Sequence, residues 1–140
     1  MTNEIWINLP VKNINRSVAF FLELGFSLNP NHGKSQESAS IIIGKKNVVV
    51  MLFDEATFTR FSGNPLSNVV SGTEVLFSID AESREEVDKM AGKVKEAGGA
   101  IYGGPAENYG WLYGFGFADL DGHRWNMMYM DMSKMPPPEF

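Results

Sequence analysis

The stretch EIWINLPVKNINRSVAFFLELG, residues 4–25, contains two hydrophobic periods in succession. Its first part alternates apolar side chains with others, and this period of two is typical of a strand. Asn13 is suited to cap a helix, and the residues after it place Val18, Phe21 and Leu22 on one helical face. The stretch therefore predicts a strand that is joined to a helix by a tight link.

The residues that follow predict three more strands. Residues 26–28 form a short one, and a polar loop that contains His32 comes after it. The β-branched runs at 39–44 and 47–53 are separated by turn residues, so they predict a hairpin. The first half thus has the order strand, helix and three strands (βαβββ), and residues 54–71 are expected to connect it to the second half.

The same order returns in the second half. Residues 73–80 alternate like a strand, Ser83 and Glu86 fit a capping box, and an apolar stripe continues the helix to Gly98. Three more strands are predicted at 100–104, 111–120 and 124–131. Two halves with one order predict an α+β fold, in which two equivalent modules share a core or a cleft.

The repeat also predicts the boundaries. Aligning Val11 with Ile79 sets the opening strands 68 residues apart, whereas the closing hairpins are 75 residues apart, and the longer second helix accounts for the difference. A single domain is expected at residues 1–132, with modules at about 4–53 and 72–131, the connector at 54–71, and a Pro-rich tail at 133–140.

Composition excludes several classes of function. The chain has 140 residues, of which 44% are hydrophobic and 21% charged, as in an ordinary globular domain. The net charge of −5 argues against nucleic acid as a partner, because phosphate contacts need cationic side chains. The absence of Cys excludes thiolate metal sites and a Cys nucleophile. No apolar run approaches the length of a membrane span, so we expect a cytoplasmic protein without a membrane partner.

Two motifs resemble a known family. The stretch INLPVKNINRSVAFFLELGFSL, residues 7–28, resembles the opening strand and helix of the vicinal oxygen chelate superfamily. That superfamily includes glyoxalase I, extradiol dioxygenases, and the bleomycin and fosfomycin resistance proteins. FADLDGHRWNMMYMD, residues 117–131, resembles its closing hairpin, and the match covers residues 4–131. The resemblance implies two βαβββ modules that form a half-barrel cleft, often within a homodimer.

The resemblance also implies where a metal would bind. In metal-dependent members, His, Glu or Gln ligands come from the first and last strands of each module. The corresponding positions here are Trp6, Met51, Glu74 and Asn126. Only Glu74 is a good ligand, and shifting the register by one or two residues does not restore the set. We therefore expect no metal and no other cofactor, with a divalent metal around Glu74 and Asn126 as the alternative.

Aromatic and apolar residues occupy the expected cleft instead, and walls of this kind are typical of small-molecule sites. Packing within a core is the simpler interpretation of most of them, whereas Trp6 and Tyr113 are expected in the cleft because each shares a strand face with polar neighbours. The residues expected to bind a ligand are Trp6, Asn8, Met51, Leu76, Trp111, Tyr113, Phe115, Asn126 and Met128. Glu74 is either an acid or base in that cleft or an ordinary surface carboxylate.

Three functions remain open. The first is a protein similar to the glyoxalase and bleomycin resistance proteins, without the usual metal, that binds a small, partly apolar organic molecule between its modules. The second is an enzyme, for which the resemblance implies a lyase similar to lactoylglutathione lyase, an isomerase or a dioxygenase. The third is a dimeric scaffold whose cleft is filled by its own side chains.

Overall fold

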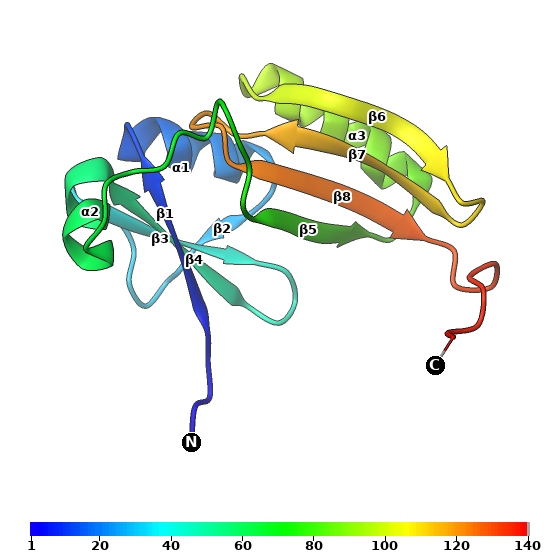
Figure 1. The fold of residues 1–140 in the computed structure, drawn as a ribbon, viewed down its shortest axis with the longest axis horizontal. Coiled ribbons are helices and arrows are strands. Elements are labelled where there is room, and N and C mark those ends of the chain that lie inside the picture. The colour runs from blue at the N-terminus through cyan, green and yellow to red at the C-terminus, as the bar shows by residue number, and fades with distance from the viewer. Residues whose placement is uncertain (140) are drawn as a thin grey trace. The chain divides into compact units, whose positions relative to one another are not determined.

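The computed structural model describes residues 1–139 and divides into two compact units. Unit 1 is Met1–Gly72, and unit 2 begins at Thr73. Each unit contains a mixed four-stranded sheet and at least one helix, in the predicted α+β order (Figure 1). None of the helices in residues 1–139 is long and apolar enough to cross a membrane.

Unit 1 follows the predicted order and adds one helix. Its sheet has the order β1-β4-β3-β2, in which β1 and β4 are parallel and the other neighbours are antiparallel. Its elements are β1 (Trp6–Val11), α1 (Ile14–Glu23), β2 (Ser27–Leu28), β3 (Ser38–Ile43), β4 (Val48–Asp54) and α2 (Glu55–Ser62).

The core of unit 1 lies between α1 and one face of the sheet. Asn13 caps α1 as predicted, because its side chain accepts a hydrogen bond from the backbone N–H of Arg16. Val18 and Phe21 are buried, but Leu22 is 40% exposed, so the prediction that Leu22 shares their face is wrong. The buried stripe continues at Ile14 and Phe20 instead. The sheet contributes Leu9, Val11, Ala39, Ile41, Val50 and Leu52 to this core.

Alternation along the strands places a second set of side chains on the opposite face of the unit 1 sheet. Asn8 lies opposite Met51 in the parallel β1–β4 pair, and Met51 lies opposite Ser40 in the antiparallel β3–β4 pair. Met51 and Ser40 each have buried apolar neighbours before and after them in sequence, and Leu9 after Asn8 is buried as well, so these neighbours face α1. Asn8, Met51 and Ser40 therefore share the face that α1 does not cover.

Unit 2 repeats the arrangement with a longer helix. Its sheet has the order β5-β8-β7-β6, again with the opening and closing strands parallel. Its elements are β5 (Leu76–Ala81), α3 (Arg84–Glu96), β6 (Ala100–Asn108), β7 (Leu112–Ala118) and β8 (Arg124–Met130). The tail follows β8, and its last residue, Phe140, lies outside the described residues. β6 is longer than the predicted 100–104, because its pairing with β7 continues past two irregularities to Asn108.

The core of unit 2 lies under α3, which runs along one face of the sheet (Figure 1). The helix buries Val87, Met90, Ala91 and Val94 as predicted. From the sheet, Phe117 stacks on Trp125 with ring centroids 6.3 Å apart, and Phe77 contacts the same indole at 4.8 Å. Large aromatic surfaces therefore supply much of the apolar burial in this unit.

The capping box at the start of α3 forms in part. The Ser83 side chain accepts from the backbone N–H of Glu86 at 3.1 Å, as predicted. The Glu86 carboxylate, however, accepts from the backbone N–H of Glu82 at 2.6 Å and not from that of Ser83. The backbone N–H of Glu86 thus has its acceptor at the helix start. The hydrogen bond to the Glu86 carboxylate comes from the residue before the one predicted.

The two units correspond with a different offset from the one predicted. Asn8 lies opposite Met51 in unit 1, and Ser78 lies opposite Asn126 in unit 2. Met51 and Asn126 are 75 residues apart, as predicted, but Asn8 and Ser78 are 70 apart and not 68. The helix caps agree, since Asn13 and Ser83 are also 70 apart.

This register changes which residue corresponds to Trp6. Trp6 lies opposite Val49, and the equivalent residue of unit 2 is Leu76, which lies opposite Arg124. Glu74 precedes β5 and is exposed, so the alignment of Trp6 with Glu74 is wrong. The prediction failed because the anchor pair Val11 and Ile79 was chosen by apolar alternation, which repeats every two residues and does not define a register.

A buried carboxylate holds the turn between β7 and β8. Asp119 is 6% exposed, and its Oδ1 accepts from the backbone N–H groups of Asp121 and His123, at 3.0 Å each. Its Oδ2 accepts from Nε1 of Trp125 at 3.1 Å. Burial raises the pKa of the Asp119 carboxyl, although the charge of His123 and the three donors oppose this shift. One side chain thus links the turn to the central indole of the core.

We expect Asp119→Asn to lower the free energy of unfolding by about 1–3 kcal/mol, because an amide NH₂ would oppose the Trp125 N–H and leave it without an acceptor. Urea unfolding followed by circular dichroism measures the change. The matched control is Asp80→Asn on exposed β5, expected to stay within about 0.5 kcal/mol of the parent protein. An Asp119→Asn protein as stable as the parent would show that the turn does not depend on this carboxylate.

Candidate functional site

Unit 1 contains a pocket of about 770 Å³ on the sheet face that α1 does not cover. Its size lies within the range of small-molecule sites, about 300–1,000 Å³. The lining residues come from β1 and the segment before it, from β3, β4 and α2, and from the loop after β2. They are Glu4, Trp6, Asn8, Asn29, His32, Ser40, Val49, Met51, Phe53, Phe58, Phe61 and Ser62. We call this the unit 1 pocket.

Three adjacent strands supply the floor of the unit 1 pocket. Asn8, Met51 and Ser40 lie side by side across β1, β4 and β3. Ser40 is fully buried, and its Oγ accepts a hydrogen bond from Nδ2 of Asn29 at 3.1 Å. Asn29 is held in turn, because its Oδ1 accepts from the backbone N–H of Asn31 at 3.0 Å. The side chains of Ser40 and Asn29 are therefore oriented by neighbouring groups.

Aromatic rings form the walls. Phe53 and Phe61 approach with ring centroids 5.4 Å apart, and Phe58 lies between them in the chain, on α2. Trp6 lies on β1 with 62% of its surface exposed, and Phe61 is 72% exposed. Such exposure of large rings is unfavourable in water, so a molecule that covers them gains hydrophobic free energy.

Some polar groups of the unit 1 pocket have no protein partner. Within residues 1–139, the side chains of Asn8 and His32 make no hydrogen bond, and both line the pocket. The indole N–H of Trp6 donates to Oε2 of Glu4 at 3.2 Å, which holds the ring at the pocket edge. No Lys or Arg is among the lining residues. The arrangement suits a mostly apolar molecule with a few hydrogen-bonding groups.

Sequence reasoning did not predict that α2 contributes to this pocket. Asp54 caps α2 by accepting from the backbone N–H of Thr57 at 2.7 Å, and Gly63 ends it in the left-handed region. The expected connector at 54–71 thus begins with a helix that belongs to unit 1. The signal was the spacing of Phe58 and Phe61, three residues apart after a capping Asp, which places both rings on one helical face.

The structure brings together three of the residues predicted to bind a ligand, and it places the others on both faces of the unit 2 sheet or just before β7. Trp6, Asn8 and Met51 all line the unit 1 pocket. The others belong to unit 2. Asn126 and Met128 point away from α3, because Trp125 and Met127, which alternate with them along β8, are buried in the core. Leu76 lies on that same face, opposite Arg124.

The two predicted residues of β7 lie on the other face of the unit 2 sheet. Phe115 is 4% exposed and packs in the core with Phe117, at a centroid distance of 5.4 Å. The Tyr113 hydroxyl donates to Oδ1 of Asp88 on α3 at 2.6 Å. Sheet alternation therefore separates Tyr113 and Phe115 from Asn126 and Met128. Trp111 lies just before β7 and is partly exposed.

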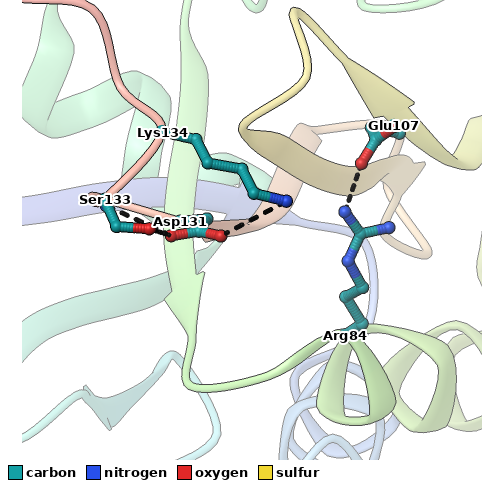
Figure 2. A network of polar contacts seen from close by, with 5 residues as sticks. All are labelled: Arg84, Glu107, Asp131, Ser133 and Lys134. Atoms are coloured by element: carbon teal, nitrogen blue, oxygen red, sulfur yellow. Dashed lines mark hydrogen bonds and ion pairs between the residues drawn. The ribbon is translucent and has the colours of Figure 1, made fainter.

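A group of charged side chains lies where α3 begins and β6 and β8 end (Figure 2). Arg84 at the start of α3 forms an ion pair with Glu107 of β6, and its guanidinium lies 4.9 Å from the centre of the Tyr113 ring. Directly after β8, Asp131 accepts from the Ser133 hydroxyl at 2.6 Å. The hydrogen bond from Arg84 is the main reason that the pKa of Glu107 falls below its ordinary value of 4.5.

This pair predicts a pH dependence of stability. Because the pKa of Glu107 is lower in the folded protein, its contribution is present above pH 4.5 and is lost as the pH falls through the folded value. Arg84→Gln should therefore destabilise the protein at pH 7 and have a smaller effect at pH 3. Urea unfolding of the parent, Arg84→Gln, Glu107→Gln and the double variant measures the coupling. Equal effects of Arg84→Gln at both pH values would contradict the prediction.

Among residues 1–139, no three His, Asp or Glu side chains gather closely enough to hold a metal ion. His32 lies in the loop after β2, and His123 follows the turn held by Asp119. The residues that line the unit 1 pocket can supply apolar contact, aromatic stacking and hydrogen bonding by amide, hydroxyl, imidazole and carboxylate groups.

Comparison with known proteins gives one family match. The model of the Glyoxalase/Bleomycin resistance protein/Dioxygenase superfamily matches residues 5–127. No match was found among curated proteins.

Several solved structures are similar to this chain. A hypothetical protein from S. aureus is 36% identical, with a TM-score of 0.81, and the match covers 92% of this chain and 95% of that one. Lactoylglutathione lyase from Agrobacterium tumefaciens is 16% identical, with a TM-score of 0.66 and coverages of 92% and 94%. An antibiotic binding protein from Streptomyces is 17% identical, with a TM-score of 0.65 and coverages of 94% and 98%. The last two show likeness of fold alone.

Proposed function

This chain belongs to the Glyoxalase/Bleomycin resistance protein/Dioxygenase superfamily, and from that premise we propose that it binds a small, partly apolar organic molecule in the unit 1 pocket. The observation that supports the proposal is a pocket with exposed aromatic walls and a floor of oriented polar groups. Fold alone would not support it, because one fold hosts many functions.

The chemistry of the unit 1 pocket favours a planar, aromatic ligand. Trp6 and Phe61 offer ring faces, and offset stacking of aromatic rings contributes about 0.5–1.5 kcal/mol beyond the area that it buries. The free amide of Asn8 both donates and accepts hydrogen bonds, so it suits a ring nitrogen, a hydroxyl or a carbonyl group. One of the proteins with a similar fold is an antibiotic binding protein, which makes antibiotic-like aromatic molecules the first group to test.

A metal of the kind that the family uses does not fit the residues present. The family's ligand positions hold Trp6 and Met51 in unit 1 and, in the register that the structure shows, Leu76 and Asn126 in unit 2. An indole and an alkyl side chain offer no metal ligand, a thioether prefers soft ions, and a neutral amide oxygen is a weak ligand without a carboxylate or imidazole beside it. We therefore propose a protein without a resident metal.

An enzyme with a metal site around Glu74 and Asn126 is the alternative. Asn126 lies opposite Ser78, and Glu74 lies four residues before Ser78 and is exposed. At about 3.3 Å per residue, an extended chain would separate the two positions by about 13 Å along the strand, farther than two ligands of one ion. The register of β5 against β8 therefore favours the binding function over the metal-dependent enzyme. Assembly as a homodimer and a cytoplasmic location stay predictions.

We expect Trp6→Ala and Phe61→Ala each to weaken the binding of an aromatic probe about ten-fold, which corresponds to about 1.4 kcal/mol. A thermal-shift screen of aromatic and antibiotic-like molecules, with quinoline as the reference probe, identifies binders. Titration monitored by amide chemical shifts then gives the dissociation constant and the residues that respond.

The matched control is Tyr109→Ala, which removes an aromatic ring that is 86% exposed and lies outside the unit 1 pocket. Its affinity should equal that of the parent protein. The proposal fails if no aromatic molecule binds, or if the responding amides lie outside the residues that line the pocket.

The proposed absence of a resident metal has its own test. The protein is incubated with nickel, cobalt, manganese, zinc or iron(II), desalted, and measured by elemental analysis. We expect less than about one ion per ten chains, because the donor set lacks clustered carboxylates and imidazoles. Retention of about one ion per chain, lost on Glu74→Gln, would replace this proposal by the metal-dependent alternative.

A further inference from the structure

We propose that the turn after β8 contains a site for a soft monovalent metal ion, copper(I), with the thioether sulfurs of Met130, Met132 and Met135 as its ligands. The ion is exchangeable, because the ligands lie at the surface. This inference goes beyond the proposed function, since none of the three residues lines the unit 1 pocket and the ion differs in class from the divalent metals considered above.

Methionine supplies the soft donors of this chain. The sequence contains eight Met and no Cys, so no thiolate competes for a soft ion. Thioether sulfur suits copper(I), whereas zinc is held by thiolate, imidazole and carboxylate ligands. A copper(I) site in this chain is therefore expected among its Met side chains.

Exposure distinguishes three methionines at the end of unit 2 from those of its core. Met90 and Met127 are 7% and 3% exposed and are buried under α3. Met130, Met132 and Met135 are 39%, 65% and 40% exposed, and they lie at or shortly after the end of β8. Single exposed apolar side chains are ordinary on a protein surface. Three thioethers in so short a stretch are a local concentration of soft donors.

A hydrogen-bonded turn gathers the three positions. The backbone N–H of Lys134 donates to the carbonyl of Asp131 at 3.0 Å, which closes a β-turn. In such a turn the first and last Cα atoms lie within about 7 Å of each other. Met130 and Met135 flank the turn, and Met132 is its second residue. The reversal of the chain therefore brings the three Met positions into one small region.

Polar contacts fix this turn (Figure 2). The backbone N–H of Asp131 donates to the carbonyl of Trp111 at 2.8 Å, which attaches the turn to the start of β7. Oδ1 of Asp131 accepts from the hydroxyl and the backbone N–H of Ser133, at 2.6 and 3.1 Å. The backbone thus holds the ligand positions. Only the Met side chains, which have three rotatable bonds each, need to move to reach an ion.

The charges around the turn permit a bound cation. The Nζ of Lys134 lies 3.9 Å from Oδ2 of Asp131, and Arg84 forms its ion pair with Glu107, so each of these cations has an anionic partner. The chain as a whole has a net charge of −5, and its field therefore favours the approach of a cation. Neutral thioether ligands add no charge of their own.

The proposed site is separate from the family's ligand position on β8, which is Asn126. Met130 follows Asn126 by four residues on β8, so at about 3.3 Å per residue the two positions are about 13 Å apart along the strand. Met132 and Met135 lie beyond the strand. A soft ion on these three thioethers would therefore leave the paired strand positions unoccupied.

The test uses the full chain with carbon-13 in its Met methyl groups. Silver(I) is a redox-stable probe that shares the preference of copper(I) for soft donors. We expect one silver(I) ion per chain, with shifts of the methyl signals of Met130, Met132 and Met135, and no shift of these signals by zinc. Competition with the chelator bathocuproine disulfonate then gives the affinity for copper(I) itself.

Replacing any one of the three ligands by Leu should weaken silver(I) binding at least about ten-fold, because one of three donors is lost. The matched control is Met128→Leu, which removes a thioether from the same strand but outside the turn and should leave the affinity unchanged. Leu is close to Met in volume, and circular dichroism confirms that each variant is folded.

Three results would overturn the proposal. Equal losses in Met128→Leu and in the turn variants would show that any thioether of the chain serves. Failure of silver(I) to shift the methyl signals of Met130, Met132 and Met135 would show that they do not bind the ion. Equal shifts with zinc and with silver(I) would contradict the assignment to a soft ion.

Discussion

The parallel pairing of β1 with β4 is the constraint on which unit 1 depends. Once Asn8 lies opposite Met51, alternation fixes every other side chain of both strands. Leu9, Val50 and Leu52 then face α1 and form the core, while Trp6 and Met51 face the pocket. A shift by one residue would exchange the two sets, so the same pairing provides both the stability of the unit and the composition of its pocket.

The fold could be predicted from sequence because its local signals agree with one another. The cap at Asn13, the alternation before it and the repeat of the same order after residue 72 all indicate the same architecture. Local signals of this kind do not define register between distant strands. The alignment of Trp6 with Glu74 failed for that reason, since apolar alternation matches equally well after a shift of two residues.

The candidate site could be predicted only where one strand face supplied it. Trp6, Asn8 and Met51 alternate with the core residues of β1 and β4, so all three lie on one face of the sheet. The structure places them together in the pocket. Tyr113 and Phe115 share a parity as well, but α3 covers their face, and no feature of β7 alone says which face a helix will cover. Phe58 and Phe61 were missed because they lie between the two repeats, where comparison of the halves carries no information.

The helix α2 has a consequence for how this pocket could diversify. Asp54, the last residue of β4, caps its start, and Gly63 ends it. The helix is therefore joined directly to the sheet at its start. Three of its residues line the pocket, yet only Thr57 is buried in the unit. Substitutions at these wall positions of α2 would therefore change the pocket wall while the strands and α1 keep their packing. The floor of the pocket, in contrast, comes from the strands that also form the core, so only the wall can vary independently of the fold.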